Sequence, residues 1–183
     1  SGSLWLGQDG YVISANKNLA GRDFQGIDVA GTARFPVGAG SVNLSLTGSY
    51  LLKKQYQDAA TTAAYDCKGV FNANCFVSPK WRHTFRVAYK APEVWSVAAK
   101  WRFMSSVNGP AANGKSGVPS YSWFDLSATA DITDNFSLTM AANNVLDKNP
   151  PLVGSAYSSN GNTFAGYYDT LGRYVSLEAT VRF

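Results

Sequence analysis

The clearest pattern in the chain is a strict alternation of apolar and polar residues over its last ten positions, 174–183. Because side chains alternate between the two faces of a β-strand, this pattern predicts a strand with one apolar and one polar face. A half-buried sheet of a soluble protein would produce it, and so would the wall of an outer-membrane barrel. The apolar set is Val175, Leu177, Ala179, Val181 and Phe183.

Six earlier segments alternate in the same way and predict, with 174–183, about seven strands of roughly ten residues each. They are 26–35, 42–51, 81–89, 95–103, 124–132 and 136–142. Short turn signals and long irregular stretches connect them in strict alternation, which is typical of outer-membrane barrels with short turns at one rim and long loops at the other. Ten tilted residues also span roughly 23 Å, close to the apolar band of about 25 Å in such barrels.

Charged residues of these segments, together with Lys53 where the second strand ends, are sorted onto the predicted polar faces. An arginine facing lipid near mid-membrane would cost about 2–4 kcal/mol, so this sorting is expected if the apolar faces contact lipid. A soluble β-sandwich binding module, which we also considered, would need a charged outer face that the pattern does not provide. The sorted residues are Asp28, Arg34, Lys53, Arg82, Arg86, Lys100, Arg102, Asp125, Asp131, Glu178 and Arg182.

Aromatic residues collect near the ends of the predicted strands. Amphipathic rings at both membrane interfaces form such girdles, although the same rings could fill a soluble β-core. The rhythm of the connections and the sorting of charge together favour the membrane wall. The girdle candidates are Phe35, Tyr50, Trp81, Tyr89, Trp95, Trp101, Phe103, Trp123, Phe124, Phe136, Tyr174 and Phe183.

Composition agrees with this interpretation and argues against several other classes. Of 183 residues, 15% are charged and 14% aromatic, with a net charge of +4 and no run of Lys or Arg. Nucleic-acid binding therefore has little support. The mean hydropathy of −0.14 is compatible with a barrel, because lumen-facing and lipid-facing residues offset each other. The sequence shows neither a transmembrane helix nor a signal peptide, so we expect it to begin at a mature end or at a cut.

Several motifs resemble the C-terminal part of TonB-dependent outer-membrane receptors. Residues 143–151, Asn-Asn-Val-Leu-Asp-Lys-Asn-Pro-Pro, are similar to the N-N-L-F-D-K-x-P stretch of that family. Residues 168–173 resemble its Y-x-x-x-G-R segment, and residues 181–183 resemble its ending with a final Phe. Weaker similarities, at Gly26-Ile27-Asp28 and at residues 79–83, occur upstream in the family's order.

The resemblance implies an all-β, antiparallel transmembrane barrel of 22 strands. Residues 1–183 would supply about seven C-terminal strands as part of one barrel domain, with the plug domain and earlier strands outside this sequence. Because unpaired backbone groups cost several kcal/mol each in a bilayer, we expect those missing strands to complete the barrel.

The implied function is active import of a scarce nutrient across the outer membrane of a Gram-negative bacterium. The nutrient would be a siderophore, cobalamin or an oligosaccharide, and the partners would be lipid, the rest of the receptor and the energy-transducing TonB complex. A passive porin or small structural barrel is the alternative, and it would need an even number of strands in one chain.

Two cysteines, Cys67 and Cys75, lie in one predicted extracellular loop. An oxidising compartment allows a disulfide between them, and two free thiols are the alternative. With a single histidine, His83, predicted on an apolar face, we expect no metal site, no Ser-His-Asp arrangement and no cofactor. Asp125 and Glu178 stand alone on polar faces, so we expect no enzyme activity.

Aromatic residues in or beside the long loops are candidates for ligand contact, because receptors of this family often hold substrates with extracellular rings. Packing within the loops is the alternative for each of them. The last residue, Phe183, resembles the terminal signal read by the outer-membrane assembly machinery. The loop candidates are Tyr56, Tyr65, Phe71, Tyr121, Tyr157, Phe164, Tyr167 and Tyr168.

Overall fold

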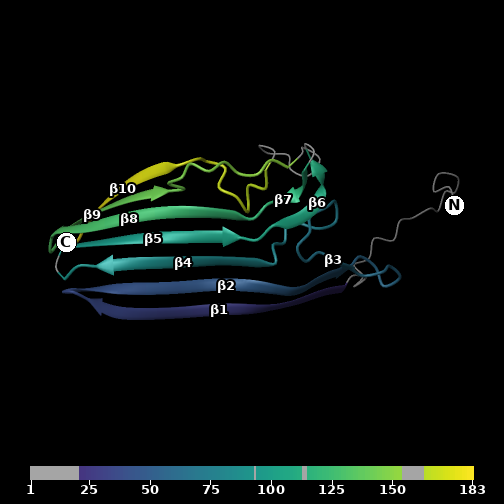
Figure 1. Ribbon diagram of the computed structural model, residues 1–183, viewed down its shortest axis with the longest axis horizontal. Coiled ribbons are helices and arrows are strands. Elements are labelled where there is room, and N and C mark those ends of the chain that lie inside the picture. The colour runs from purple at the N-terminus through teal and green to yellow at the C-terminus, as the bar shows by residue number, and fades with distance from the viewer. Residues whose placement is uncertain (1–20, 93, 113–114, 154–162) are drawn as a thin grey trace, which may run out of the picture.

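The computed structural model describes residues 21–92, 94–112, 115–153 and 163–183, whose regular structure is entirely β-strand (Figure 1). Within these residues, seven long antiparallel strands form one sheet in the order β1-β2-β4-β5-β8-β9-β10. The all-β antiparallel prediction is therefore confirmed. The strands are β1 (Gly21–Val37), β2 (Gly40–Gln57), β4 (Trp81–Lys90), β5 (Trp95–Met104), β8 (Tyr121–Thr133), β9 (Phe136–Asn143) and β10 (Tyr174–Val181).

The connections keep the predicted short-long rhythm and place the two kinds at opposite ends of the sheet, here called the turn end and the loop end (Figure 1). Gly38 closes the β1–β2 turn with a φ of 58°, a left-handed conformation that glycine adopts without strain. The loop end carries the short strand β3 (Tyr65–Asp66), which pairs with β2, and the hairpin of β6 (Val107–Ala112) and β7 (Lys115–Val118). No described segment is a helix able to cross a membrane.

Several strand limits differ from the prediction. β1 and β2 run to the loop end as a longer ribbon, and β8 begins at Tyr121 instead of Phe124. β10 ends at Val181, although the backbone N–H of Arg182 still donates to Asn135 across the edge at 2.9 Å. Backbone pairing extends these strands past the point where the apolar-polar alternation ends, so periodicity alone predicted them too short.

A β-bulge reverses the alternation near the loop end of β2. Gly26 pairs with Leu51 but Gln25 pairs with Lys53, so Leu52 is the extra residue. Lys53 therefore lies opposite Gln25, and the prediction that it belongs to the polar face is wrong. Lys54 takes the polar face instead.

The register aligns the apolar positions of all seven long strands into one continuous apolar face. Large side chains on it remain exposed: Leu126 is 50% accessible and Leu177 is 68% accessible. An apolar face of this extent on a water-facing sheet would be a strong liability, so it calls for an apolar medium. One complete row across the sheet is Phe35, Val42, Tyr89, Val97, Ala128, Met140 and Leu177.

The buried core lies on the other side, between the loops and the polar face of the sheet. Trp123, predicted for the aromatic girdle, belongs to this core and is 3% exposed. That prediction is wrong because odd-numbered residues at the start of β8 point toward the loops. The core consists of Phe71, Val77, Met104, Val107, Val118, Tyr121, Trp123, Val153 and Tyr168, with Phe164 packed against it.

The loop that follows β2 is closed by a disulfide between Cys67 and Cys75, whose Cα atoms are 5.4 Å apart. Both cysteines are buried, and Phe71 within the bridged loop and Val77 just after it belong to the core. The predicted pairing is present, and it constrains this loop against the polar face.

The two faces predict opposite responses to the same substitution at neighbouring positions of β8. In the complete protein, Leu126→Arg should place a charge on the apolar face and cost about 2–4 kcal/mol if that face meets lipid. Ser127→Arg, on the polar face, is the matched control and should assemble normally. Heat-modifiable migration of the outer-membrane fraction in SDS gels measures assembly, and equal amounts of the two variants would contradict a lipid-facing surface.

Candidate functional site

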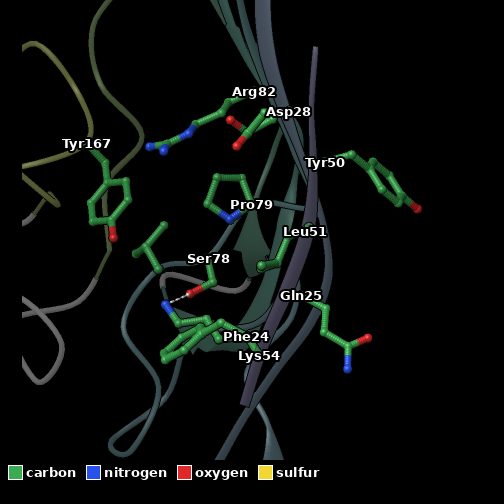
Figure 2. A pocket seen from close by; sticks show the side chains of 13 residues that line it. Phe24, Gln25, Asp28, Tyr50, Leu51, Lys54, Ser78, Pro79, Arg82 and Tyr167 are labelled. Carbon is green, nitrogen blue, oxygen red and sulfur yellow. Dashed lines mark hydrogen bonds between the residues drawn. The ribbon is translucent and has the colours of Figure 1, made fainter. Parts of the chain in front are cut away.

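A cleft of about 360 Å³ opens on the polar face at the loop end, where β1, β2 and β4 meet the disulfide loop. Figure 2 shows Phe24, Lys54, Pro79 and Arg82 on the same side of the sheet as Tyr167. Tyr167 belongs to the loop between β9 and β10, here called the last loop. Gln25 and Tyr50 project from the opposite side (Figure 2). The cleft therefore combines two cations and one carboxylate, Asp28, with aromatic and apolar walls.

The β-bulge places Lys54 in this cleft. Its Nζ donates to Ser78 Oγ at 2.6 Å and lies 6.0 Å from the centre of the Phe24 ring and 5.9 Å from that of Tyr56. These contacts hold the ammonium group between a hydroxyl and two ring faces. A sequence pattern with uninterrupted alternation would have put Lys53 here instead.

Consecutive tyrosines of the last loop have different environments. Tyr168 is buried and packs against the rings of Tyr121 and Trp123, with centroids 5.4 and 5.8 Å away. Tyr167 is 37% exposed and lines the cleft. Tyr168 thus anchors the segment in the core, and Tyr167 presents its ring to the cleft.

An ion cluster beside this segment ties the last loop to the strands. Arg102 on β5 donates to Asp125 on β8 through Nε at 2.9 Å and Nη2 at 3.2 Å. The same guanidinium donates to Asp169 at 2.5 and 3.2 Å, and Lys100 Nζ lies 3.1 Å from Asp125. Asp125 also accepts from the backbone N–H of Asn144 at 2.9 Å. Asp125 therefore contacts Arg102, Lys100 and the Asn144 backbone, and the prediction that it is a lone carboxylate is wrong.

The family-like segment 143–151 folds into a compact turn with a structural role. Asn144 and Asp147 adopt positive φ values of 49° and 51°. The Asn144 side chain exchanges hydrogen bonds with the backbone of Lys148 at 3.0 Å each, while Asp147 Oδ1 accepts from the Arg173 N–H at 2.7 Å. Asn and Asp tolerate this left-handed backbone better than most residues, which explains their presence in the motif.

The predicted contact aromatics separate into buried and accessible groups. Phe71, Tyr121 and Tyr168 are 2–3% exposed and form part of the loop core, so their placement supports the packing alternative. Tyr56 and Tyr65 lie with tilted rings whose centroids are 6.0 Å apart at the β2–β3 edge. Phe164 packs against the core, and Tyr157 lies outside the described residues.

Three further aromatic residues do not line the cleft. His83 lies on the apolar face, with ring centroids 4.5 Å from Trp101 and 5.3 Å from Phe103, as its alternation predicted. Phe183 is fully exposed at the chain end, and its role in assembly stays a prediction. Sequence reasoning missed Phe76, which is 81% exposed beside the disulfide, because no periodic pattern covers that loop.

An open antiparallel sheet with an uncovered apolar face and a loop-covered polar face is a segment of barrel wall. The chain belongs to the family described as TonB dependent receptor-like, beta-barrel, whose model matches residues 4–145. Proteins of this family are outer-membrane transporters of Gram-negative bacteria and not enzymes.

A solved structure supports the same fold. The chain aligns with a point mutant of the ferric enterobactin receptor of Pseudomonas aeruginosa at a TM-score of 0.52 and 16% sequence identity. The match covers 84% of this chain and 22% of that receptor, so the chain spans about a fifth of its length. A search of curated proteins gives no match.

The ion cluster predicts that Asp169 holds the last loop on the wall. In the complete receptor, Asp169→Asn should remove one partner of Arg102 and weaken the loop locally by about 1 kcal/mol, because the pair is partly exposed to solvent. Backbone amide exchange over residues 163–173 should accelerate severalfold. Glu178→Gln, a polar-face carboxylate outside the cluster, is the control, and equal exchange in both variants would contradict the anchoring role.

Burial also predicts a response to alkaline pH. It raises the pKa of the Tyr168 hydroxyl from 10.0 to about 12, with Tyr121 adding a smaller effect. The folded loop therefore favours the neutral phenol. This contribution is fully present below pH 10 and is lost as the pH rises from 10 to 12.

Tyr168→Phe keeps the ring and removes the ionising group, so its loop core should stay packed to higher pH than in the parent receptor. Near-ultraviolet circular dichroism between pH 9 and 12 measures the packing of these rings. Coincident titration curves for the two proteins would show that ionisation of Tyr168 does not loosen the loop.

Proposed function

We propose that this chain is the C-terminal part of the barrel wall of an active importer that depends on TonB. The observation that carries the proposal is the division of one sheet into an uncovered apolar face and a polar face with a cleft at its loop end. A barrel built from such strands presents its apolar face to lipid and its polar face to the lumen. The family membership supports the same arrangement.

The cleft is suited to a nutrient that carries both negative charge and flat apolar surface. Lys54 and Arg82 supply two positive charges against the single negative charge of Asp28, and Phe24 and Tyr167 supply rings to the same space. An iron–siderophore complex with anionic oxygen ligands matches this chemistry better than a neutral oligosaccharide does. Tyr56 and Tyr65 lie farther out at the β2–β3 edge, where they could meet the same ligand during its capture.

The rest of the receptor supplies what this sheet requires for stability. β1 and β10 are its edges and do not pair with each other among the described strands. Unpaired backbone groups at both edges would be costly in a bilayer, so earlier strands of the barrel should pair with them. A plug domain would occupy the lumen and connect it to TonB, and Phe183 would serve in assembly.

The test uses the complete receptor, including its upstream region, in a Gram-negative host that lacks its own siderophore receptors. Growth under iron limitation with individual ferric siderophores should require both this receptor and TonB. Equal uptake with and without TonB would instead identify a passive porin, and growth supported by none of the siderophores would reject them as the substrate class.

Tyr167→Ala should weaken surface binding of the supporting siderophore about tenfold, because removal of a contacting tyrosine ring commonly costs more than 1 kcal/mol. Phe76→Ala is the matched control: it removes an exposed ring at the same loop end that does not line the cleft. Binding of the labelled ferric siderophore to whole cells at 0 °C measures the affinity without transport. Equal affinities of the two variants would exclude Tyr167 as a ligand contact.

A further inference from the structure

Three adjacent strands of the sheet carry many cations and no carboxylate. β2, β4 and β5 contain no Asp or Glu over their whole length. Such a one-sided distribution creates a positive field along the wall, which attracts anions. The cations of these strands are Lys53, Lys54, Arg82, Arg86, Lys90, Lys100 and Arg102.

Four of these cations already have local partners. Lys53 forms an ion pair with Asp23, and Lys54 donates a hydrogen bond to Ser78. Lys100 and Arg102 both form ion pairs with Asp125. The remaining three, Arg82, Arg86 and Lys90, all belong to β4 and are exposed. Within the described part of the chain, none of the three forms an ion pair or donates a side-chain hydrogen bond.

The three free cations form a regular row. They occupy every fourth position of β4, so they share the polar face and lie about 13 Å apart at the usual rise of a strand. Each one faces a serine across the β2–β4 ladder: Arg82 faces Ser49, Arg86 faces Ser45 and Lys90 faces Ser41. A cation next to a hydroxyl is a combination that binds phosphate, carboxylate or phenolate oxygens.

This row connects the two ends of the wall. Arg82 lines the loop-end cleft, which is the proposed substrate site. Lys90 and Ser41 line a second cleft of about 600 Å³ at the turn end, where Arg34 donates to Ser41 Oγ at 3.3 Å. The carboxylates closest in register are two strands away: Asp28 lies opposite Ser49 on β1, and Asp125 lies opposite Lys100, the β5 partner of Arg86. Lys90 also lines a cleft with Asp131 and Asp134 at the turn end, and no ion pair joins the row to any of these carboxylates among the described residues. The row is therefore continuous from one cleft to the other.

We propose that the polar faces of β2 and β4 form an anion track with three stations, Arg82/Ser49, Arg86/Ser45 and Lys90/Ser41. An anionic substrate with phosphate, carboxylate or phenolate oxygens would leave the loop-end cleft and pass these stations on its way to the turn end. The inference rests on the proposed function, because the polar face must line the lumen. Repeated weak sites allow an ion both to enter and to leave.

Open stations of this kind differ from a fixed structural ion pair. Arg102 stacks over Trp123 at 5.0 Å and is satisfied by two carboxylates, as expected of a permanent contact. The β4 cations have Thr84 and Ala88 between them along the strand and serines opposite them on β2. On the β5 side they face Met104, Lys100 and Ser96, and none of these is a carboxylate. Without a carboxylate directly opposite any of the three cations, this surface leaves room for a mobile anionic ligand.

The experiment measures ion passage through the complete receptor in a planar lipid bilayer, with urea added to loosen the plug and open the lumen. The opened pore should prefer Cl⁻ over K⁺ in a KCl gradient, and inorganic triphosphate should block its current. Arg86→Gln and Lys90→Gln should each weaken the triphosphate block about tenfold and lower the preference for Cl⁻. Arg86→Lys keeps the charge and should retain most of the block.

Lys53→Gln is the matched control, because it removes one positive charge from the neighbouring strand but on the opposite face. It should leave selectivity and block unchanged. If the β4 variants keep the wild-type selectivity and block and only lower the urea concentration that opens the pore, these cations dock the plug and the track is wrong. Because this measurement uses neither TonB nor a nutrient, its failure is distinct from TonB-independent uptake, which would overturn the importer itself.

Discussion

The structure depends on one constraint: the two-residue period of the strands exposes an apolar face that nothing in the described chain covers. In water this face would drive association, whereas in a bilayer it is the surface that stabilises the fold. Within the described residues, the buried core, with its aromatic residues from the loops, lies on the other side of the sheet. The apolar side therefore needs only correct alternation, and specific packing is concentrated on the polar face at the loop end.

On that polar face, charge performs two separate tasks. Arg102, Asp125 and Asp169 connect two strands and the last loop through hydrogen bonds of 2.5–3.2 Å. They position Tyr168 in the core and leave Tyr167 beside the cleft. The cations of β4 have no such partners among the described residues and remain available to anions. Basic residues thus stabilise one part of the wall, and in another part they form the surface that we propose binds anions.

Prediction from sequence succeeded where one periodic rule applies and failed where several segments meet. The seven long strands, the short turns and the position of His83 all follow from alternation. Lys53 and Trp123 were misplaced because a bulge and a loop contact each override that alternation locally. The family-like motif at 143–151 could be identified from its residues, but its role as a turn that joins β9 to the last loop required the hydrogen bonds of Asn144 and Asp147.

The amino-acid sequence by itself determined the class of protein, since alternation, loop rhythm and motif order are all local properties of the chain. Tertiary structure decided which side chains meet. It brought Lys54 and Arg82 to Tyr167, which lies more than 80 residues away in the chain, and it separated the accessible ring of Tyr167 from the buried one of Tyr168. The physical reason is that side-chain alternation sets the face of a residue, whereas strand register and loop packing set its neighbours.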